Sequence, residues 1–122
     1  MSDPIEADGP HRLIKMVDEI VRKDFRKSLR VRDLARRVGV TPNYLSALYR
    51  WEAGKTITRV LLERRIELAK ELLQKTNLRI RQVARAVGFQ SPYYFSRRFR
   101  QYQSMSPKAY RAQVRGGSSA DE

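Results

Sequence analysis

The side chains of this chain that could take part in chemistry are mostly cationic. Its 122 residues include 26 Lys and Arg against 13 Asp and Glu, which gives a formal net charge of +13 at pH 7. Guanidinium and ammonium groups in such excess attract and hydrogen-bond anionic oxygens, so the composition indicates a polyanionic partner. The alternative is a basic surface that is simply solvated.

Other chemistry has few residues to work with. The chain has no Cys and a single His, His11, so disulfides, thiolate metal sites and His-based catalytic triads are excluded. We find no paired carboxylates, nucleophile–base set, metal cluster or phosphate-binding loop, and therefore expect no enzyme, no cofactor and no small-molecule ligand. No apolar run approaches the roughly 18 residues of a membrane span, and no signal peptide is visible. We therefore expect a cytoplasmic protein without a membrane partner.

Two stretches of the chain repeat one another. Residues 29–39 (LRVRDLARRVG) match residues 78–88 (LRIRQVARAVG) at a constant offset, and residues 41–50 match residues 91–100 with one residue added. Between the copies lie residues 56–75, whose apolar side chains recur at spacings of three and four, with no Gly or Pro. The pattern predicts one supersecondary unit present twice, on either side of a long helix.

The spacing within each copy is typical of a helix-turn-helix. A small residue, a Gly four positions later and a following apolar residue recur as Ala35, Gly39 and Leu45, and as Ala84, Gly88 and Phe95. The small residue lets two helices cross closely, and Gly supplies the positive φ that a tight turn needs. Each second helix begins with a capping hydroxyl and a Pro, at residues 41–42 and 91–92.

Apolar periodicity elsewhere completes an all-α architecture of seven helices. We predict a disordered tail or linker remnant over residues 1–10, a first helix-turn-helix subdomain over 11–55, a linker helix over 56–75, a second subdomain over 76–115 and a flexible tail over 116–122. The side chains that face outward on the second helix of each copy are Asn43, Ser46, Ala47 and Arg50, and then Tyr93, Ser96, Arg97 and Arg100.

Several stretches resemble the DNA-binding region of the AraC/XylS family of bacterial transcription regulators. They are residues 65–73 (RIELAKELL), 83–89 (VARAVGF), 91–100 (SPYYFSRRFR) and 106–111 (SPKAYR), within a resemblance over roughly residues 11–113. It implies seven helices, with two helix-turn-helix units joined by a long helix. It also implies a sequence-specific, DNA-binding transcription regulator, commonly an activator that contacts RNA polymerase.

In this family the second helix of each unit enters the DNA major groove. The resemblance implies base-reading roles for Asn43, Ser46, Ala47, Gln90, Tyr93, Ser96 and Arg97, and phosphate contacts by Arg30, Arg50, Arg79, Ser91, Arg100 and Lys108. Arg97 suits guanine, whose O6 and N7 a guanidinium can bond together, and Asn43 suits adenine. The alternative for each is an ordinary exposed polar residue.

Departures from the family pattern modify these expectations. Ala47 stands where a longer reader is common, so we expect the first unit to read through DNA shape or a thymine methyl group, and the second to be the better reader. Arg30 and Arg79 are poor N-caps, which suggests that a phosphate lies at both positions.

Ser104 replaces the Gly that is usual before the last helix. We expect Trp51 to cover the first subdomain rather than to contact a sugar.

The expected mechanism places two direct repeats along one face of a duplex. The linker helix would set them about one DNA turn, roughly 34 Å, apart on an asymmetric double-stranded site of about 20 base pairs. Two other classes of protein remain open. They are a sequence-neutral nucleic-acid binder, which a low specificity ratio would favour, and a helical module whose basic face meets an acidic protein.

Overall fold

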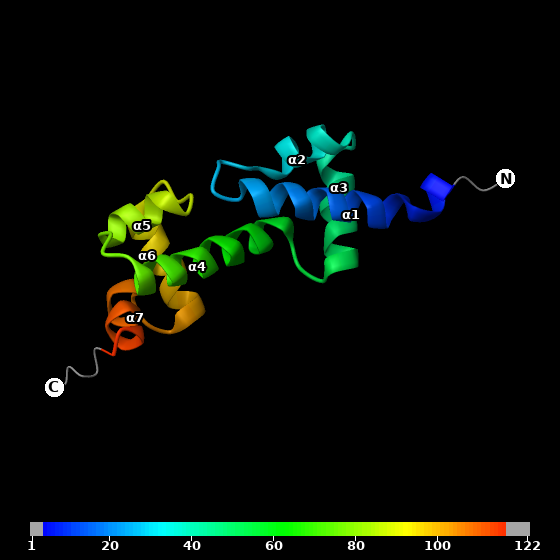
Figure 1. Cartoon of the computed structure of the whole chain (residues 1–122). Coiled ribbons are helices and arrows are strands. Elements are labelled where there is room, and N and C mark those ends of the chain that lie inside the picture. The colour runs from blue at the N-terminus through cyan, green and yellow to red at the C-terminus, as the bar shows by residue number, and fades with distance from the viewer. Residues whose placement is uncertain (1–3, 117–122) are drawn as a thin grey trace. The chain divides into compact units, whose positions relative to one another are not determined.

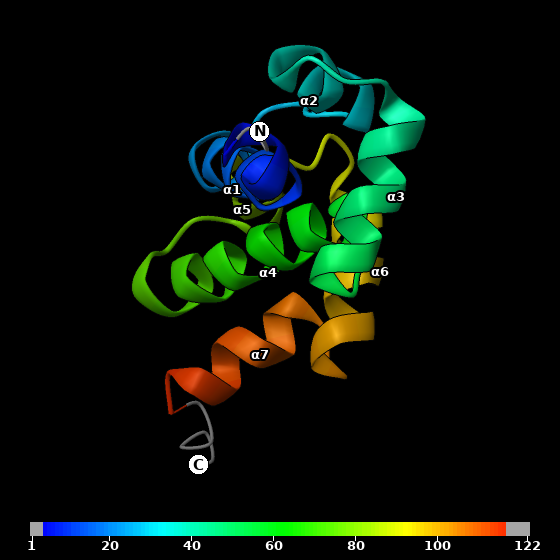
Figure 2. The same ribbon diagram turned by 90° about the vertical axis from the view of Figure 1, so that its right-hand side faces the viewer.

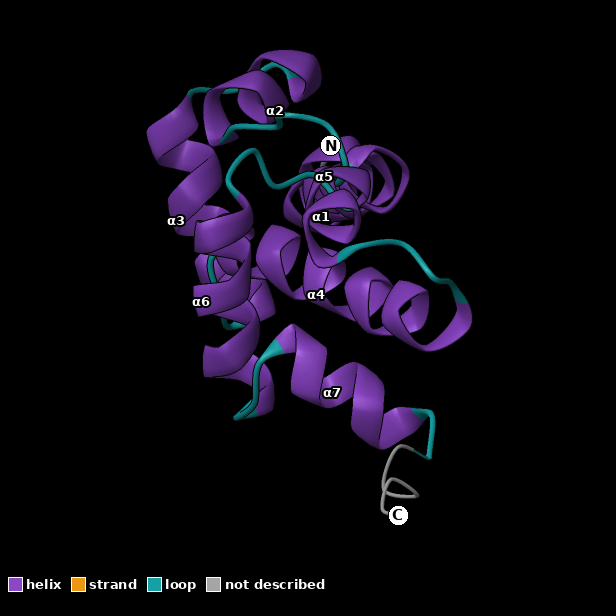
Figure 3. Ribbon diagram, turned by 90° about the vertical axis from the view of Figure 1, so that its left-hand side faces the viewer, coloured by secondary structure: helices purple, strands orange, loops and turns teal. Residues whose placement is uncertain are grey.

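The computed structural model describes residues 4–116, and this part of the chain consists of seven α-helices joined by loops, with no strand (Figure 1, Figure 3). The helices are α1 (Pro4–Asp24), α2 (Val31–Val38), α3 (Pro42–Ala53), α4 (Ile57–Lys75), α5 (Ile80–Ala86), α6 (Pro92–Gln103) and α7 (Pro107–Val114). The predicted all-α class is confirmed. The chain divides within α4 into two compact units, unit 1 ending at Glu63 and unit 2 beginning at Arg64. None of the described helices is both long and apolar enough to span a membrane.

The first helix is longer than the sequence predicts. Helix α1 begins at Pro4 and continues through Pro10, whereas the prediction placed residues 1–10 in a disordered tail and began the helix at His11. Pro4 is the first helical residue, a position that Pro favours, and the fixed φ of Pro10 is itself helical. The correction concerns residues 4–10. Residues 1–3, and residues 117–122 of the predicted C-terminal tail, lie outside the described residues.

Four helices contribute to one apolar core in unit 1. The buried side chains are Val17 and Val21 of α1, Leu34 and Ala35 of α2, Leu45 and Tyr49 of α3, and Ile57 and Leu61 of α4. Helix α3 leaves the end of α2 at a steep angle (Figure 2). The Tyr49 hydroxyl donates a hydrogen bond to Asp18 Oδ1 at 2.7 Å, so α3 is attached to α1 by a polar contact as well as by apolar packing.

The core of unit 2 is richer in aromatic rings. Its buried side chains include Ile66, Ala69 and Leu73 of α4, Val83 and Ala84 of α5, Val87 and Phe89 of the turn, and Phe95 and Phe99 of α6. Ring centroids lie 5.1 Å apart for Phe89 and Phe95, 5.7 Å for Phe95 and Phe99, and 5.5 Å for Phe99 and Tyr110 of α7. These tilted and edge-on contacts are the favourable geometries for aromatic pairs, and they connect the turn, α6 and α7.

Helix α7 covers the C-terminal end of α4. Arg111 Nε donates to the Leu73 carbonyl at 3.0 Å, and Arg115 Nε donates to the Gln74 carbonyl at 3.1 Å. Both guanidinium groups also donate to the Thr76 carbonyl. The last carbonyls of a helix have no partner within it and carry partial negative charge, so two cations there satisfy both needs. Burial lowers the pKa of Arg111, and the charge of Arg115 lowers it further.

Candidate nucleic-acid interface

The turn of unit 1 is fixed by backbone geometry. Helix α2 ends at Gly39, whose φ of +80° lies in the left-handed region, and the Val40 N–H donates to the Ala35 carbonyl at 2.9 Å. Thr41 Oγ1 then accepts the Tyr44 N–H at 3.2 Å and caps α3. Because the turn and the cap are both specified, the direction in which α3 leaves the turn is set locally.

Unit 2 repeats these backbone contacts in a turn that is one residue longer, because Gln90 precedes the cap. Gly88 has a φ of +108°, the Phe89 N–H donates to the Ala84 carbonyl at 2.9 Å, and Ser91 Oγ accepts the Tyr94 N–H at 3.1 Å. Each bond has its counterpart in unit 1. The prediction of a helix-turn-helix that occurs twice is therefore confirmed.

The outward face of α3 carries the four side chains that the sequence predicts. Asn43, Ser46, Ala47 and Arg50 are all exposed. The opposite face of the helix is buried at Leu45 and Tyr49. The face is therefore a stripe of short polar and small side chains that ends in one cation. This stripe can donate and accept hydrogen bonds with little loss of side-chain conformational entropy, because only Arg50 has a long side chain.

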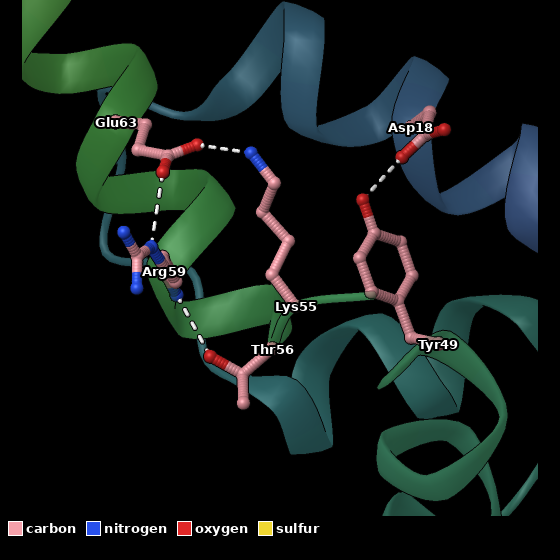
Figure 4. A network of polar contacts seen from close by, with 6 residues as sticks. All are labelled: Asp18, Tyr49, Lys55, Thr56, Arg59 and Glu63. Atoms are coloured by element: carbon pink, nitrogen blue, oxygen red, sulfur yellow. Dashed lines mark hydrogen bonds and ion pairs between the residues drawn. The ribbon is translucent and has the colours of Figure 1, made fainter. Parts of the chain in front are cut away.

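Polar contacts hold the segment that follows α3 (Figure 4). Glu63 accepts hydrogen bonds from Lys55 Nζ at 2.8 Å and from Arg59 Nε at 3.0 Å. Thr56 Oγ1 accepts the Arg59 N–H at 3.1 Å and so caps the start of α4. The hydrogen bond from Lys55, followed by that from Arg59, holds the pKa of Glu63 below its ordinary range.

The outward face of α6 is more basic and more aromatic. Gln90, Tyr93 and Arg97 are exposed, and Ser96 is half-buried. The Arg97 guanidinium carbon lies 5.9 Å from the centroid of the Tyr93 ring, one helical turn away. A cation stacked on an aromatic face loses part of its rotational freedom before any ligand arrives. Arg97 is thus partly ordered for a partner that binds the outward face.

A second stacked arginine lies on the same helix. The Arg98 guanidinium carbon is 5.9 Å from the Tyr94 ring centroid and 6.0 Å from that of Tyr102. Its Nε is buried and has no hydrogen-bond partner among the described residues. At the equivalent positions of α3 the sequence has Ala47 and Leu48, so α3 and α6 differ most where α6 carries these two cations.

The residues predicted to contact phosphate are exposed, and two of them have an unexpected arrangement. Arg30 and Arg79 are the N-caps of α2 and α5, and their backbone N–H groups donate to Asp33 Oδ2 at 3.0 Å and to Gln82 Oε1 at 2.8 Å. The residue three positions onward thus supplies a capping contact, and the guanidinium group is not needed for it. The other exposed members are Arg50, Ser91, Arg100 and Lys108.

The expectation that Trp51 covers the first subdomain is wrong. Its side chain is 84% exposed, whereas Tyr49, two residues earlier on the same helix, is only 3% exposed. The stacking of Arg97 on Tyr93 was not predicted, although their spacing of four residues on one helix was a usable signal. Among residues 4–116, no group of three or more His, Asp or Glu side chains could hold a metal ion.

Comparison with known proteins agrees with this arrangement. Residues 34–113 match the helix-turn-helix domain family. The transcriptional regulator CdhR of Pseudomonas aeruginosa is 36% identical over 101 residues, which are 83% of this chain and 30% of CdhR. A transcriptional regulator from Chromobacterium violaceum with an AraC-type DNA-binding domain is similar in structure, with 29% identity and a TM-score of 0.77 over 87% of this chain and 95% of the other.

A structure with bound DNA is also similar. The DNA-binding domain of the global transcriptional factor AdpA, solved in complex with a target DNA, has 27% identity and a TM-score of 0.78 over 85% of this chain and 93% of the other. The chain spans 30% of the length of CdhR and 36% of that of the Msm operon regulatory protein of Streptococcus mutans, which is about a third of each of these two relatives. From the repeated turn, the seven helices and these matches together, we conclude that the chain belongs to the AraC/XylS family of transcription regulators, as a helix-turn-helix domain of that type.

Proposed function

We propose that this chain binds double-stranded DNA in a sequence-specific manner and regulates transcription, with α3 and α6 each entering a major groove. The observation that carries the proposal is the equivalence of the two turns, which leave the outward face of each following helix exposed and polar. An α-helix fits the major groove of B-DNA, where each base pair presents a distinct set of donors and acceptors. The excess of cations supplies the attraction to phosphate.

In unit 2, Arg97 is the main base reader of this proposal. Its guanidinium lies over the Tyr93 ring on the exposed face of α6, and it can donate two parallel hydrogen bonds to O6 and N7 of one guanine. Gln90, Tyr93 and the half-buried Ser96 are the other proposed readers of this unit. Because the guanidinium is already partly ordered, less conformational entropy is lost when it binds.

In unit 1, the proposed readers have shorter side chains. Asn43 can bond N6 and N7 of an adenine together, Ser46 can donate or accept, and Ala47 can meet a thymine methyl group. All three are exposed on α3. The attachment of that helix to α1 through Tyr49 and Asp18 supports the proposal, because short side chains read bases only if the helix itself is held close to them.

Phosphate contacts would hold both helices in their grooves. The proposed residues are Arg30, Arg50, Arg79, Ser91, Arg100 and Lys108, all of them exposed. Such contacts fix the orientation of a protein on the duplex without reading sequence. Ser91 is the N-cap of α6. The N-cap of α7 is Ser106, so Lys108 lies in the first turn of that helix. Both Ser91 and Lys108 are therefore at a helix N-terminus, which favours an anion.

The site proposed for the whole chain is asymmetric. Unit 1 and unit 2 follow one another as direct repeats of one polypeptide, and two-fold related half-sites need a dimer instead. We infer a site of about 20 base pairs, with two read segments about 10 base pairs apart. Contact with RNA polymerase, an activating role and a cytoplasmic location are part of the proposal because the family is one of bacterial transcription regulators.

Selection of bound sites from a pool of random duplexes tests the proposal. We expect two enriched segments of unlike sequence, separated by about one helical turn of DNA. Binding without any enrichment would instead indicate a sequence-neutral nucleic-acid binder. If the chain instead binds an acidic protein, and competitor DNA does not reduce that binding, its partner is the protein. Both outcomes contradict the proposed function.

A further inference from the structure

Trp51 is the one tryptophan of the chain, and it faces solvent. It is 84% exposed near the end of α3, although the same helix buries Tyr49 almost completely. A single exposed apolar residue is common on protein surfaces and needs no explanation by itself. Trp51, however, lies on the proposed reading helix, next to the stripe of exposed residues on α3.

Helix geometry places Trp51 in line with two members of this stripe. Asn43, Ala47 and Trp51 are four residues apart, and residues at that spacing follow one another along one face of an α-helix. Side chains on a helix lean toward its N-terminus, so the indole of Trp51 extends from its own backbone toward Ala47. Ala47 is short and leaves room there. The two residues thus form one apolar surface beside the polar stripe.

The charges around this surface suit a polyanion. Arg50 precedes Trp51 and is exposed. The carboxylate that follows it, Glu52, is directed to α1, where Glu52 Oε1 lies 3.7 Å from Nδ1 of His11. The next carboxylate along the chain, Glu63, is occupied by Lys55 and Arg59. Glu52 and Glu63 therefore have side-chain neighbours of their own, and a phosphate backbone can approach Trp51 beside Arg50.

We propose that Trp51 and Ala47 together form an apolar DNA contact on the wall of the major groove, where they take up a thymine C5-methyl group or the adjoining deoxyribose. Both groups present the same chemistry, a small saturated carbon surface next to phosphate. The contact replaces the long polar reader that Ala47 cannot supply. This inference rests on the proposed function, and it specifies what the reading helix of unit 1 recognises.

The intrinsic fluorescence of Trp51 tests the contact directly, because no other tryptophan contributes. Binding is followed separately, through the anisotropy of a fluorescein-labelled duplex taken from the selected pool. At saturating DNA we expect acrylamide to quench Trp51 at least about threefold less efficiently, since the indole loses most of its exposed surface. DNA binding that leaves quenching unchanged would overturn the inference and leave the proposed function intact. A wild-type chain that binds no duplex would overturn both.

A pair of variants tests whether the contact contributes to affinity. Trp51→Ala is expected to raise Kd about tenfold, with an unchanged slope of log K against log[salt] because no phosphate contact is lost. The matched control is Met16→Ala, another exposed apolar residue of unit 1 that lies on α1, which should leave Kd within about twofold. Circular dichroism verifies that both variants are folded. Equal affinities of Trp51→Ala and wild type would contradict the inference.

Duplexes in which deoxyuridine replaces thymidine at single positions identify the group that is contacted. If one such replacement weakens wild-type binding and leaves Trp51→Ala unaffected, the contact is with that thymine methyl group. If the effect of Trp51→Ala is the same in every deoxyuridine duplex, the contact is with deoxyribose. Either result supports an apolar DNA contact.

Discussion

Helices α3 and α6 follow turns that are held by equivalent hydrogen bonds, and they present different chemistry. In both, a Gly with positive φ, one backbone bond to the small residue of the preceding helix and a hydroxyl N-cap fix the start. Outward, α6 presents an arginine stacked on a tyrosine, whereas α3 presents Asn43, Ser46 and Ala47. In both helices the backbone contacts set where the helix starts, and the exposed residues are free to differ.

Replacing the buried residue that follows each turn should have the largest effect. Phe95 and Leu45 occupy equivalent positions and are fully buried. Phe95→Ala should lower the free energy of unfolding by about 3–5 kcal/mol and Leu45→Ala by about 2–5 kcal/mol, because each leaves a cavity. Urea denaturation followed by circular dichroism measures both. A loss below about 1 kcal/mol at Phe95 would contradict the importance of the aromatic row in unit 2.

Removing the reader of each helix should affect binding next most strongly. Arg97→Ala should cost about 1–3 kcal/mol of binding free energy and relax the preference at one base pair. Asn43→Ala, the matched change in unit 1, should relax a preference in the other segment of the site. Affinities for a panel of single-base variants of the selected duplex measure both effects. If the ratios between the affinities for these duplexes are the same in Arg97→Ala as in wild type, the assignment of Arg97 as a base reader is wrong.

Substitutions at the C-caps of α3 and α6 should change stability in opposite directions. Gly54 and Ser104 are the C-caps of α3 and α6, with φ values of +79° and +61°. An added Cβ at Gly54 meets nothing within 4 Å, so only its conformation opposes a side chain there. Gly54→Ala should therefore destabilise the protein by about 1 kcal/mol, and Ser104→Gly should stabilise it by up to about 1 kcal/mol. Thermal unfolding of the two variants measures both, and a stabilising Gly54→Ala would refute the argument.

The arginine N-caps Arg30 and Arg79 test whether both units hold phosphate. Each is exposed, and the acceptor at the third helical position leaves its guanidinium unused for capping. Arg79→Ala should lower the slope of log K against log[salt] by about one unit, and Arg30→Ala should do the same. Salt titrations of DNA binding measure the slopes. An unchanged slope would remove that residue from the phosphate contacts.

Acid should affect unit 1 first, and this is the smallest effect that we expect. A hydrogen bond from Arg37 holds the pKa of Asp24 below its ordinary range, and one from Lys55 does the same for Glu63. A lowered folded-state pKa stabilises the fold at neutral pH, and the contribution is lost as the pH falls from the ordinary carboxyl pKa, roughly 4, through the lowered one. The stability of Glu63→Gln should therefore depend less on pH in this range than that of wild type. Identical pH profiles would contradict the assignment.

Much of the fold follows from local pattern, and the exceptions depend on contacts that the pattern does not contain. The two turns were predicted because only a few residue types fit a left-handed backbone, and the helices because their apolar residues recur at helical spacing. The start of α1 was missed because Pro4, Gly9 and Pro10 are usually found outside helices. In Pro4–Asp24, two of these positions are compatible with helical φ.

Site residues were predictable in so far as they face outward on a helix. The exposure of Asn43, Arg97 and their neighbours follows from helical periodicity alone. The exposure of Trp51 was not foreseen, because large aromatics are usually buried and the pattern gives no means of telling a cover from a contact. Nor could the partners of Arg111 and Arg115 be foreseen, since long side chains reach carbonyls that are distant in sequence.

Arg111 of α7 and Arg115, which directly follows that helix, have a practical consequence for anyone who shortens this polypeptide. The match to the helix-turn-helix domain family stops at residue 113, so a fragment cut at that point would lack Arg115. The carbonyl oxygens of Gln74 and Thr76 would then lose a donor, and the last turn of α4 would fray more readily. A recombinant fragment intended for binding measurements should therefore extend at least through Gly116.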